Sequence, residues 1–172
     1  MESYTTVLTE EQIAKRVKEL GAQITKDYNG QEIIVICMLK GAVYFFADLT
    51  KNIKCPIQVD FARLSSYRNG TVSGKMEVIS EITTNITGKD VLIVEDIIDS
   101  GKTLDFFIKL LKKKNPRSIK ICAFLDKPER REVDIKVDYA GFNMECGFVI
   151  GYGMDYAEKY RELPILAELH FD

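Results

Sequence analysis

The 172-residue sequence lacks the features of a cysteine- or histidine-based metal centre, a disulfide framework or a membrane span. Its four cysteines, at positions 37, 55, 122 and 146, form no C-x-x-C pair, and the sole histidine, His170, has no histidine or cysteine near it. Because three of the cysteines lie in or beside apolar runs, we expect buried thiols rather than ligands. The longest apolar run, 33–39, is far too short to cross a bilayer.

An excess of charge of either sign is also missing. The 24 basic and 26 acidic residues give a formal charge of −2, so nothing attracts the chain globally to nucleic acid or an anionic membrane. Residues 1–12 carry glutamates and no apolar core, unlike a signal or transit peptide. We therefore expect a cytoplasmic protein that binds small molecules at local sites.

What the sequence does contain is alternating helical and strand patterns, without repeats or linkers. Thr9 and Gln12 form a capping box before a helix that should end near 28–30. Further helices are predicted at 42–52 and 104–114, and strands at 33–39, 57–64, 76–82, 91–95 and 118–125, with short strands in a loop-rich C-terminal part. Residues 65–75 are expected to form a mobile loop. Continuous apolar strands between helices predict one α/β domain over 1–172, with a mainly parallel sheet covered on both faces.

The most informative stretch is 91–103, VLIVEDIIDSGKT, in which a buried strand ends in two acids and a short loop enters a helix. Ligands of open α/β sheets bind at the carboxyl ends of the strands, where a helix N-terminus offers free N–H groups and a positive dipole. Glu95 and Asp96 suit the vicinal hydroxyls of a ribose and can also hold a metal. The backbone donors expected around one phosphate belong to Asp99, Ser100, Gly101, Lys102 and Thr103.

Two alternatives compete with this interpretation. The GKT sequence at 101–103 suggests a nucleoside-triphosphate P-loop, but that motif needs a glycine where this chain has Asp96. The carboxylates of Asp96 and Asp99 would also repel a triphosphate. Alternatively, Asp99 and Ser100 merely cap the helix and the two acids form a solvated strand end. This capping interpretation explains any single acid of the string, whereas the whole thirteen-residue string favours a site for a ribose with one phosphate.

The string closely resembles the phosphoribosyl pyrophosphate signature of type I phosphoribosyltransferases, and the resemblance extends from about residue 7 to 169. It implies the type I fold, with a small loop-rich hood built from terminal segments and a base-binding region at 147–172. It also implies Mg²⁺ as cofactor, held by Glu95, Asp96 and Asp155. A homodimer or homotetramer is expected from the same resemblance.

Two segments resemble the pyrophosphate-binding parts of the hypoxanthine-guanine members. MLKGA (38–42) is similar to their turn, often preceded by a cis peptide, which implies that Lys40 and Gly41 contact pyrophosphate. SSYRNGTVSGK (65–75) is similar to their flexible loop, in which Ser66 and Tyr67 would fold over the pyrophosphate and exclude water. Read alone, these are a strand-to-helix turn and a surface hairpin.

Two further segments resemble the parts that bind 6-oxopurines. In FLDKPERR, Lys127 would read the oxygen at purine C6. In GFVIGYGMDYAEKYREL (147–163), Phe148 would stack on the base and the backbone of Val149 would meet its Watson–Crick edge. Asp155, in this base-binding segment, would hold Mg²⁺ through water, and Arg161 would bind pyrophosphate. Without the resemblance, these side chains would be ordinary core and surface residues.

The resemblance predicts an enzyme of purine salvage that transfers 5-phosphoribosyl to N9 of hypoxanthine or guanine, giving IMP or GMP. Asp99 would be the proton partner of N7, and Lys127 would stabilise charge on the purine oxygen. A silent regulator that binds nucleic acid would need a continuous basic face, but the only basic triplet, 112–114, ends a predicted helix, where cations are favoured anyway. Preference among hypoxanthine, guanine and xanthine stays open, as does dimer versus tetramer.

Overall fold

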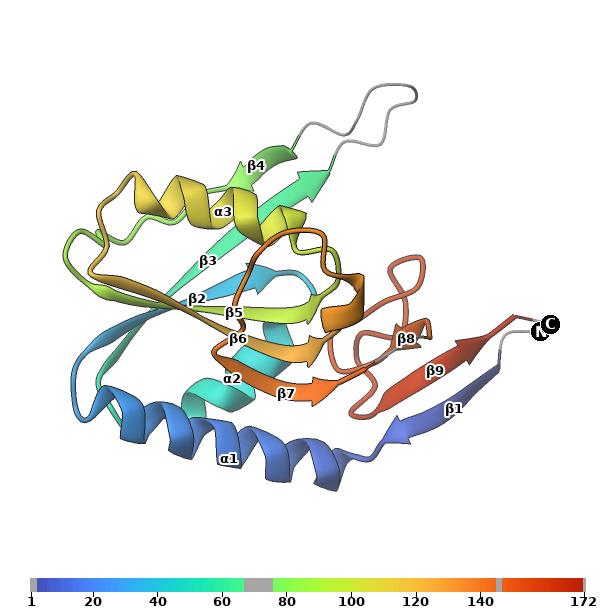
Figure 1. Cartoon of the computed structure of the whole chain (residues 1–172). Helices are drawn as coiled ribbons and strands as arrows, with labels where there is room; N and C mark the ends of the chain where they lie inside the picture. The colour runs from blue at the N-terminus through green and yellow to red at the C-terminus, as the bar shows by residue number, and fades with distance from the viewer. Residues whose placement is uncertain (1–2, 67–75, 145–146, 172) are drawn as a thin grey trace.

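The computed structural model describes residues 3–66, 76–144 and 147–171. Its centre is the predicted, mainly parallel sheet (Figure 1), whose strands run in the order β4-β3-β2-β5-β6-β7. Each neighbouring pair is parallel except β3 and β4. The strands are β2 (Ile33–Leu39), β3 (Ile57–Ser66), β4 (Met76–Ser80), β5 (Asp90–Ile98), β6 (Ser118–Asp126) and β7 (Tyr139–Asn143).

Helices cover both faces of this sheet, as the continuous apolar strands predicted. α1 (Glu10–Tyr28) and α2 (Val43–Asn52) lie on one face, and α3 (Lys102–Lys112) lies on the other (Figure 1). On β2, Val35 and Cys37 belong to the core under α1 and α2, whereas Ile34 and Ile36 belong to the core under α3. Burying each such isoleucine or valine stabilises the fold by about 1.5–3 kcal/mol.

The first helix follows the sequence signals closely. The amide of Gln12 donates to Thr9 Oγ1 at 3.3 Å, and the amide of Thr9 donates to Gln12 Oε1 at 2.8 Å. The helix ends at Tyr28, where Asn29 adopts a left-handed conformation. The predicted capping box and helix end are therefore confirmed.

A second, smaller sheet lies beyond the carboxyl ends of the parallel strands. It consists of β1 (Ser3–Leu8), β9 (Leu166–His170) and β8 (Val149–Ile150), paired antiparallel in the order β1-β9-β8. Figure 1 shows β1 and β9, the first and last strands, side by side there, and the arrowheads of β2, β5 and β6 point toward this sheet. The hood predicted from terminal segments is thus present.

Some element boundaries differ from the prediction. The strand expected at 91–95 continues to Ile98, because β5 stays paired with β6 beyond the acids. The helix expected at 104–114 is Lys102–Lys112, and the strand expected at 76–82 ends at Ser80. Residues 65 and 66, expected in a loop, extend β3 by pairing with β4; the rest of that loop, 67–75, lies outside the described residues.

The cysteines were expected to be buried thiols, and those that the structure describes are. Cys37, Cys55 and Cys122 are buried and free, while Cys146 lies outside the described residues. Burial raises the pKa of the Cys37 thiol to about 12, a value that suits a small apolar side chain. Within the described part of the chain, no helix combines the length and apolar character needed to span a membrane.

Candidate active site

The loop between β5 and α3 lines a small cavity at the carboxyl edge of the sheet. The cavity measures about 120 Å³ and is bordered by Glu95, by residues 97–101 and by Thr103 and Leu104. Its wall is the start of α3, whose first N–H groups have no partner within the helix. A concave helix N-terminus of this kind attracts an anion.

Gly101 sets the shape of this loop. It is the residue before α3 and has a φ of 81°, in the left-handed region that favours glycine. A Cβ at this position would also lie 2.9 Å from Arg131 Cδ and from Val133 Cγ2. The side chain of Lys102 forms an ion pair with Glu132.

Asp99, at the mouth of the loop, has two arginines beside it. Arg130 Nε lies 2.8 Å from Asp99 Oδ1, but this buried oxygen accepts no hydrogen bond among the described residues. Arg131 Nε donates to the backbone carbonyl of Asp99 at 3.2 Å, and the Arg131 guanidinium also pairs with Asp126. Asp99 is therefore held by its backbone and by the ion pair with Arg130, although its Oδ1 accepts no hydrogen bond among the described residues.

Glu95 and Asp96 form a crowded acidic pair at the end of β5. Burial and the neighbouring Asp96 carboxylate raise the pKa of Glu95 well above its usual range. Burial also raises the pKa of Asp96, although the charge of Arg161 opposes that shift. A cation or hydroxyl donors would relieve this crowding, and hard oxygen ligands of this kind fit Mg²⁺.

The turn after β2 packs directly on the acidic pair. The Leu39–Lys40 peptide is cis, as the resemblance implied. A Cβ on Gly41 would lie 1.7 Å from Asp96 Oδ2, and a Cβ on Gly153 would lie 1.9 Å from the carbonyl oxygen of Gly41. Two glycines thus allow the β2 turn, the end of β5 and the segment after β8 to meet.

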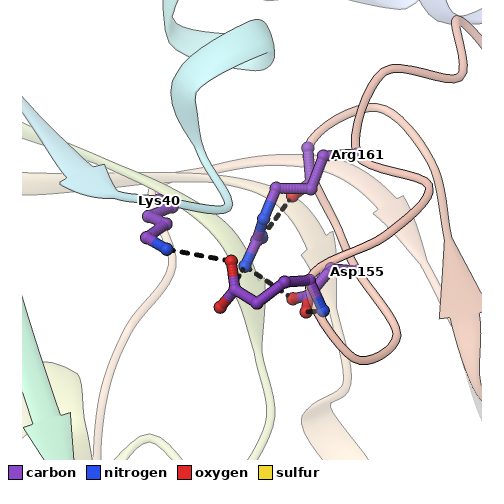
Figure 2. Close-up of polar contacts among 5 residues, drawn as sticks. Lys40, Asp155 and Arg161 are labelled. Atoms are coloured by element: carbon purple, nitrogen blue, oxygen red, sulfur yellow. Dashed lines mark hydrogen bonds and ion pairs between the residues drawn. The ribbon is translucent and has the colours of Figure 1, made fainter.

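Figure 2 shows a charged cluster where that segment faces the β2 turn. Arg161 donates to the carbonyl of Gly153 at 2.7 Å and pairs with Asp155 Oδ1 at 2.8 Å, but its buried Nε has no acceptor among the described residues. Lys40 Nζ pairs with Glu158 Oε2 at 2.9 Å. The amide of Glu158 donates to Asp155 Oδ2 at 2.8 Å, so both oxygens of Asp155 are engaged.

The predicted metal ligands differ in the contacts that already engage them. Glu95 and Asp96 adjoin each other, whereas Asp155 is committed to Arg161 and the Glu158 amide. The described residues hold no cluster of three His, Cys, Asp or Glu side chains suited to an ion. Direct protein ligands would therefore come from the acidic pair.

Lys127, predicted to read a base, lies beside the loop at 99–103. Ile98 and Asp126 are paired across β5 and β6, and the amide of Lys127 donates to the carbonyl of Ile98 at 3.0 Å. Lys127 is only 4% exposed, and its Nζ donates to the carbonyl of Gly147 at 3.2 Å. A buried ammonium has three protons to satisfy, which favours a further acceptor next to it.

Phe148 and Val149 follow Gly147. The Phe148 ring is 47% exposed and contacts the rings of Tyr156 and Phe171 edge-on, at centroid distances of 5.6 and 6.2 Å. Val149 is buried and pairs through β8 with Glu168. About half of Phe148 is therefore exposed, and the interpretation of Phe148 as plain core is wrong.

Of the two residues predicted to fold over pyrophosphate, Ser66 ends β3 opposite Met76. Tyr67 lies outside the described residues. Sequence reasoning missed Arg130, Arg131 and Glu158. The signal for the arginines was the PERR string after Lys127, but nothing in the sequence indicated which acids they contact.

Fold and site together define an α/β protein with an anion-attracting cavity at a helix N-terminus. The family model described as phosphoribosyl transferase domain matches residues 3–157. The hypoxanthine-guanine phosphoribosyltransferase of Bacillus subtilis is 48% identical over 164 residues, which cover 95% of this chain and 91% of that protein. The chain therefore belongs to the phosphoribosyltransferase family and, within it, to the hypoxanthine-guanine group.

Solved structures agree with this membership. A crystal structure of a hypoxanthine-guanine phosphoribosyltransferase from Bacillus anthracis has a TM-score of 0.93 and 45% identity, covering 99% of this chain and 100% of that one. A bifunctional protein TilS/HprT of Listeria monocytogenes is 43% identical, and the match covers 95% of this chain but 25% of that longer protein. The predicted fold and enzyme class are confirmed, in place of the P-loop and silent-regulator alternatives.

Proposed function

We propose that this enzyme transfers the 5-phosphoribosyl group of phosphoribosyl pyrophosphate to N9 of hypoxanthine or guanine, giving IMP or GMP and pyrophosphate. The observation that carries the proposal is the meeting of three groups at one sheet edge. These are the anion-attracting loop at 99–103, the acidic pair at 95–96 and the buried Lys127 beside them.

The phosphoribosyl group would bind along the end of β5. The amides of residues 100–103 and the Thr103 hydroxyl would hold the 5-phosphate in the cavity. The carboxylates of Glu95 and Asp96 would accept hydrogen bonds from the ribose hydroxyls. Holding the sugar at both ends orients its anomeric carbon toward the base.

The pyrophosphate would bind between the β2 turn and the segment after β8. Lys40, the backbone of Gly41 and Arg161 face this space, and Ser66 and Tyr67 are proposed to close over it. Glu95 and Asp96 would hold Mg²⁺ directly, and Asp155 through water; the ion, when bound, supplies charge neutralisation for the leaving group. Arg161, with its free Nε–H, adds donors to the same oxygens.

The purine would lie against Phe148, with its C6 oxygen at Lys127 and its Watson–Crick edge at the backbone of Val149. Positive charge develops on the ribose as the bond to pyrophosphate breaks and N9 bonds to the anomeric carbon. Asp99, whose Oδ1 is ion-paired with Arg130 but accepts no hydrogen bond among the described residues, would accept the N7 proton, and Lys127 would stabilise negative charge on the oxygen.

Incubation with Mg²⁺, phosphoribosyl pyrophosphate and one purine at a time tests this function. We expect nucleotide and pyrophosphate in equal amounts with hypoxanthine or guanine, and none when phosphoribosyl pyrophosphate is omitted. Nucleotide formation from adenine or orotate alone would contradict the proposed base site.

Three expectations stay predictions: a single domain over residues 1–172, a homodimer or homotetramer, and a cytoplasmic location. Light scattering coupled to size-exclusion chromatography measures the assembly directly. A mass of two or four times the 19.6 kDa chain is the expected result.

A further inference from the structure

The carboxylate of Glu158 lies between the two cations that the proposed function gives to pyrophosphate. One oxygen is 2.9 Å from Lys40 Nζ and the other is 3.6 Å from an Arg161 terminal nitrogen (Figure 2). Lys40 and Glu158 are 118 residues apart in the chain, so this bridge joins the β2 turn to the segment after β8. An anionic group of the protein thus sits where an anionic substrate group is expected.

The local backbone directs Glu158 to this position. Ala157 and Glu158 have φ values of 51° and 64°, in the left-handed region that non-glycine residues seldom adopt. The Glu158 amide is held by Asp155 Oδ2 at 2.8 Å, which fixes the turn. Backbone conformations of this kind cluster at functional sites, where the surrounding structure holds a side chain in a defined position.

Glu158 is the member of the cluster that can leave. Its side chain is 66% exposed, whereas that of Arg161 is 22% exposed and anchored to the Gly153 carbonyl. An exposed pair between two flexible side chains holds weakly, so an incoming polyanion can replace it. The Lys40 ammonium, through its hydrogen bond and its charge, lowers the pKa of Glu158 below its ordinary value.

We propose that Glu158 is an internal competitor of pyrophosphate, which occupies Lys40 and Arg161 in the empty enzyme and must be displaced when the pyrophosphate end of a substrate binds. The inference rests on the proposed function. Its consequence is a lower affinity for pyrophosphate, because the same donors cannot serve both anions. After transfer, the returning carboxylate would assist release of the product.

Titration calorimetry of pyrophosphate with Mg²⁺ into the wild-type chain and Glu158→Gln tests the inference. The amide keeps the shape and removes the charge, and we expect pyrophosphate to bind about two- to fivefold more tightly, the scale of one exposed ion pair. Glu162→Gln is the matched control, since it removes one exposed negative charge from the same segment. Among the described residues, the Glu162 carboxylate forms no ion pair with Lys40 or Arg161. This control substitution should leave the affinity unchanged.

Steady-state kinetics give a second readout. The KM for phosphoribosyl pyrophosphate should fall in Glu158→Gln while kcat does not rise, and the gain in affinity should shrink when Lys40→Met is added. Unchanged or weaker pyrophosphate binding by Glu158→Gln, or an equal gain in Glu162→Gln, would overturn the inference. If the wild type forms nucleotide in the same assay, such a negative result overturns only the role of Glu158 as a competitor. If the wild type forms no nucleotide, the proposed function fails as well.

Discussion

Asp99 occupies a position where backbone and side chain have separate tasks. Its carbonyl is held by Arg131, and its Oδ1 is near Arg130 but accepts no hydrogen bond among the described residues. The backbone and Arg130 therefore place the residue, and in the proposed function its carboxylate would accept the purine proton. A neutral side chain of the same size should keep the placement and lose the chemistry.

We expect Asp99→Asn to lower kcat by roughly 10²-fold, the scale of general acid–base catalysis. Affinity for phosphoribosyl pyrophosphate should change little, because the loop amides are unaltered. Rapid-mix kinetics and a binding titration measure the two effects. Asp105→Asn, which removes a carboxylate paired with Lys109 on α3, is the control; an unchanged kcat in Asp99→Asn would remove Asp99 from the mechanism.

Lys127 is the residue for which burial adds most to the sequence argument. Its Nζ has one described acceptor, the Gly147 carbonyl. Lys127→Met keeps the length and should lower kcat/KM for hypoxanthine by about 10- to 100-fold, since one charged hydrogen bond is lost. Phosphoribosyl pyrophosphate affinity, measured by calorimetry, should persist. An equal loss of both would mean that Lys127 supports the loop rather than the base.

At this scale the sequence revealed residue types but not contacts. Glu95, Asp96 and the loop at 99–103 follow one another in the chain, so their proximity could be read from a strand–loop–helix pattern. Arg130 and Glu158 could not be found this way, because their partners Asp99 and Lys40 are brought to them by the fold. Only the three-dimensional arrangement shows which surface charges meet.

Among the elements, the contact between the β2 turn and the segment after β8 depends on two glycines. Gly153 has a φ of 101°, and a Cβ there would overlap the Gly41 carbonyl. The hood can therefore approach the sheet only if this position lacks a side chain.

Gly153→Ala should destabilise the fold by about 1–3 kcal/mol and move Arg161 away from the turn. We predict a rise in the KM for phosphoribosyl pyrophosphate together with a lower midpoint in urea. Gly30→Ala is the control for backbone strain alone, since Gly30 also has a positive φ but nothing within 4 Å of a Cβ. Equal KM values for the two variants would contradict the proposed contact.

The start of β5 is fixed by a buried carboxylate. Asp90 accepts from Arg117 Nε at 3.0 Å and from the Ser118 hydroxyl at 2.7 Å, and the hydrogen bond from Arg117 is the main reason that its pKa is lowered. A carboxyl group whose folded pKa is depressed stabilises the protein above its unfolded pKa and loses that contribution as pH falls through the folded value.

Asp90→Asn should therefore lower the free energy of unfolding by about 1–2 kcal/mol at neutral pH. The effect is no larger because Arg117 is exposed and solvent screens the pair. The difference from wild type should narrow below about pH 4, where the unfolded carboxyl becomes protonated. Urea unfolding at pH values from neutral to below about pH 4 measures this difference in the free energy of unfolding. Arg117→Gln, alone and combined with Asp90→Asn, completes a double-mutant cycle. A difference that stays constant with pH would show that charge is not the cause.

Helices and strands were predictable where their burial requires a regular pattern of apolar residues in the sequence. β2, buried on both faces, was predicted residue for residue, and the capping box located the start of α1. β1 was not predicted, because almost all its residues are exposed and it is held by backbone pairing with β9. The same limit applies to the last residues of β5, where pairing continues past the apolar run.

Across the whole molecule, function arises from segments distant in sequence that meet at one edge. The carboxyl ends of β2, β5 and β6 present the turn, the acidic pair and Lys127, and the hood adds Phe148 and Arg161 from the C-terminal part. Parallel pairing ensures that these strand ends lie together, which is why the fold class alone predicted where the candidate site lies. How the hood meets the turn could not be deduced, because it depends on individual glycines.

A crystal structure of the wild-type chain with IMP tests the central claim most directly. We predict that the 5-phosphate lies within hydrogen-bond distance of the amides of residues 100–103, the ribose hydroxyls at Glu95 and Asp96, and the purine ring on Phe148. A nucleotide bound with its phosphate away from this loop, or at another edge of the sheet, would contradict it.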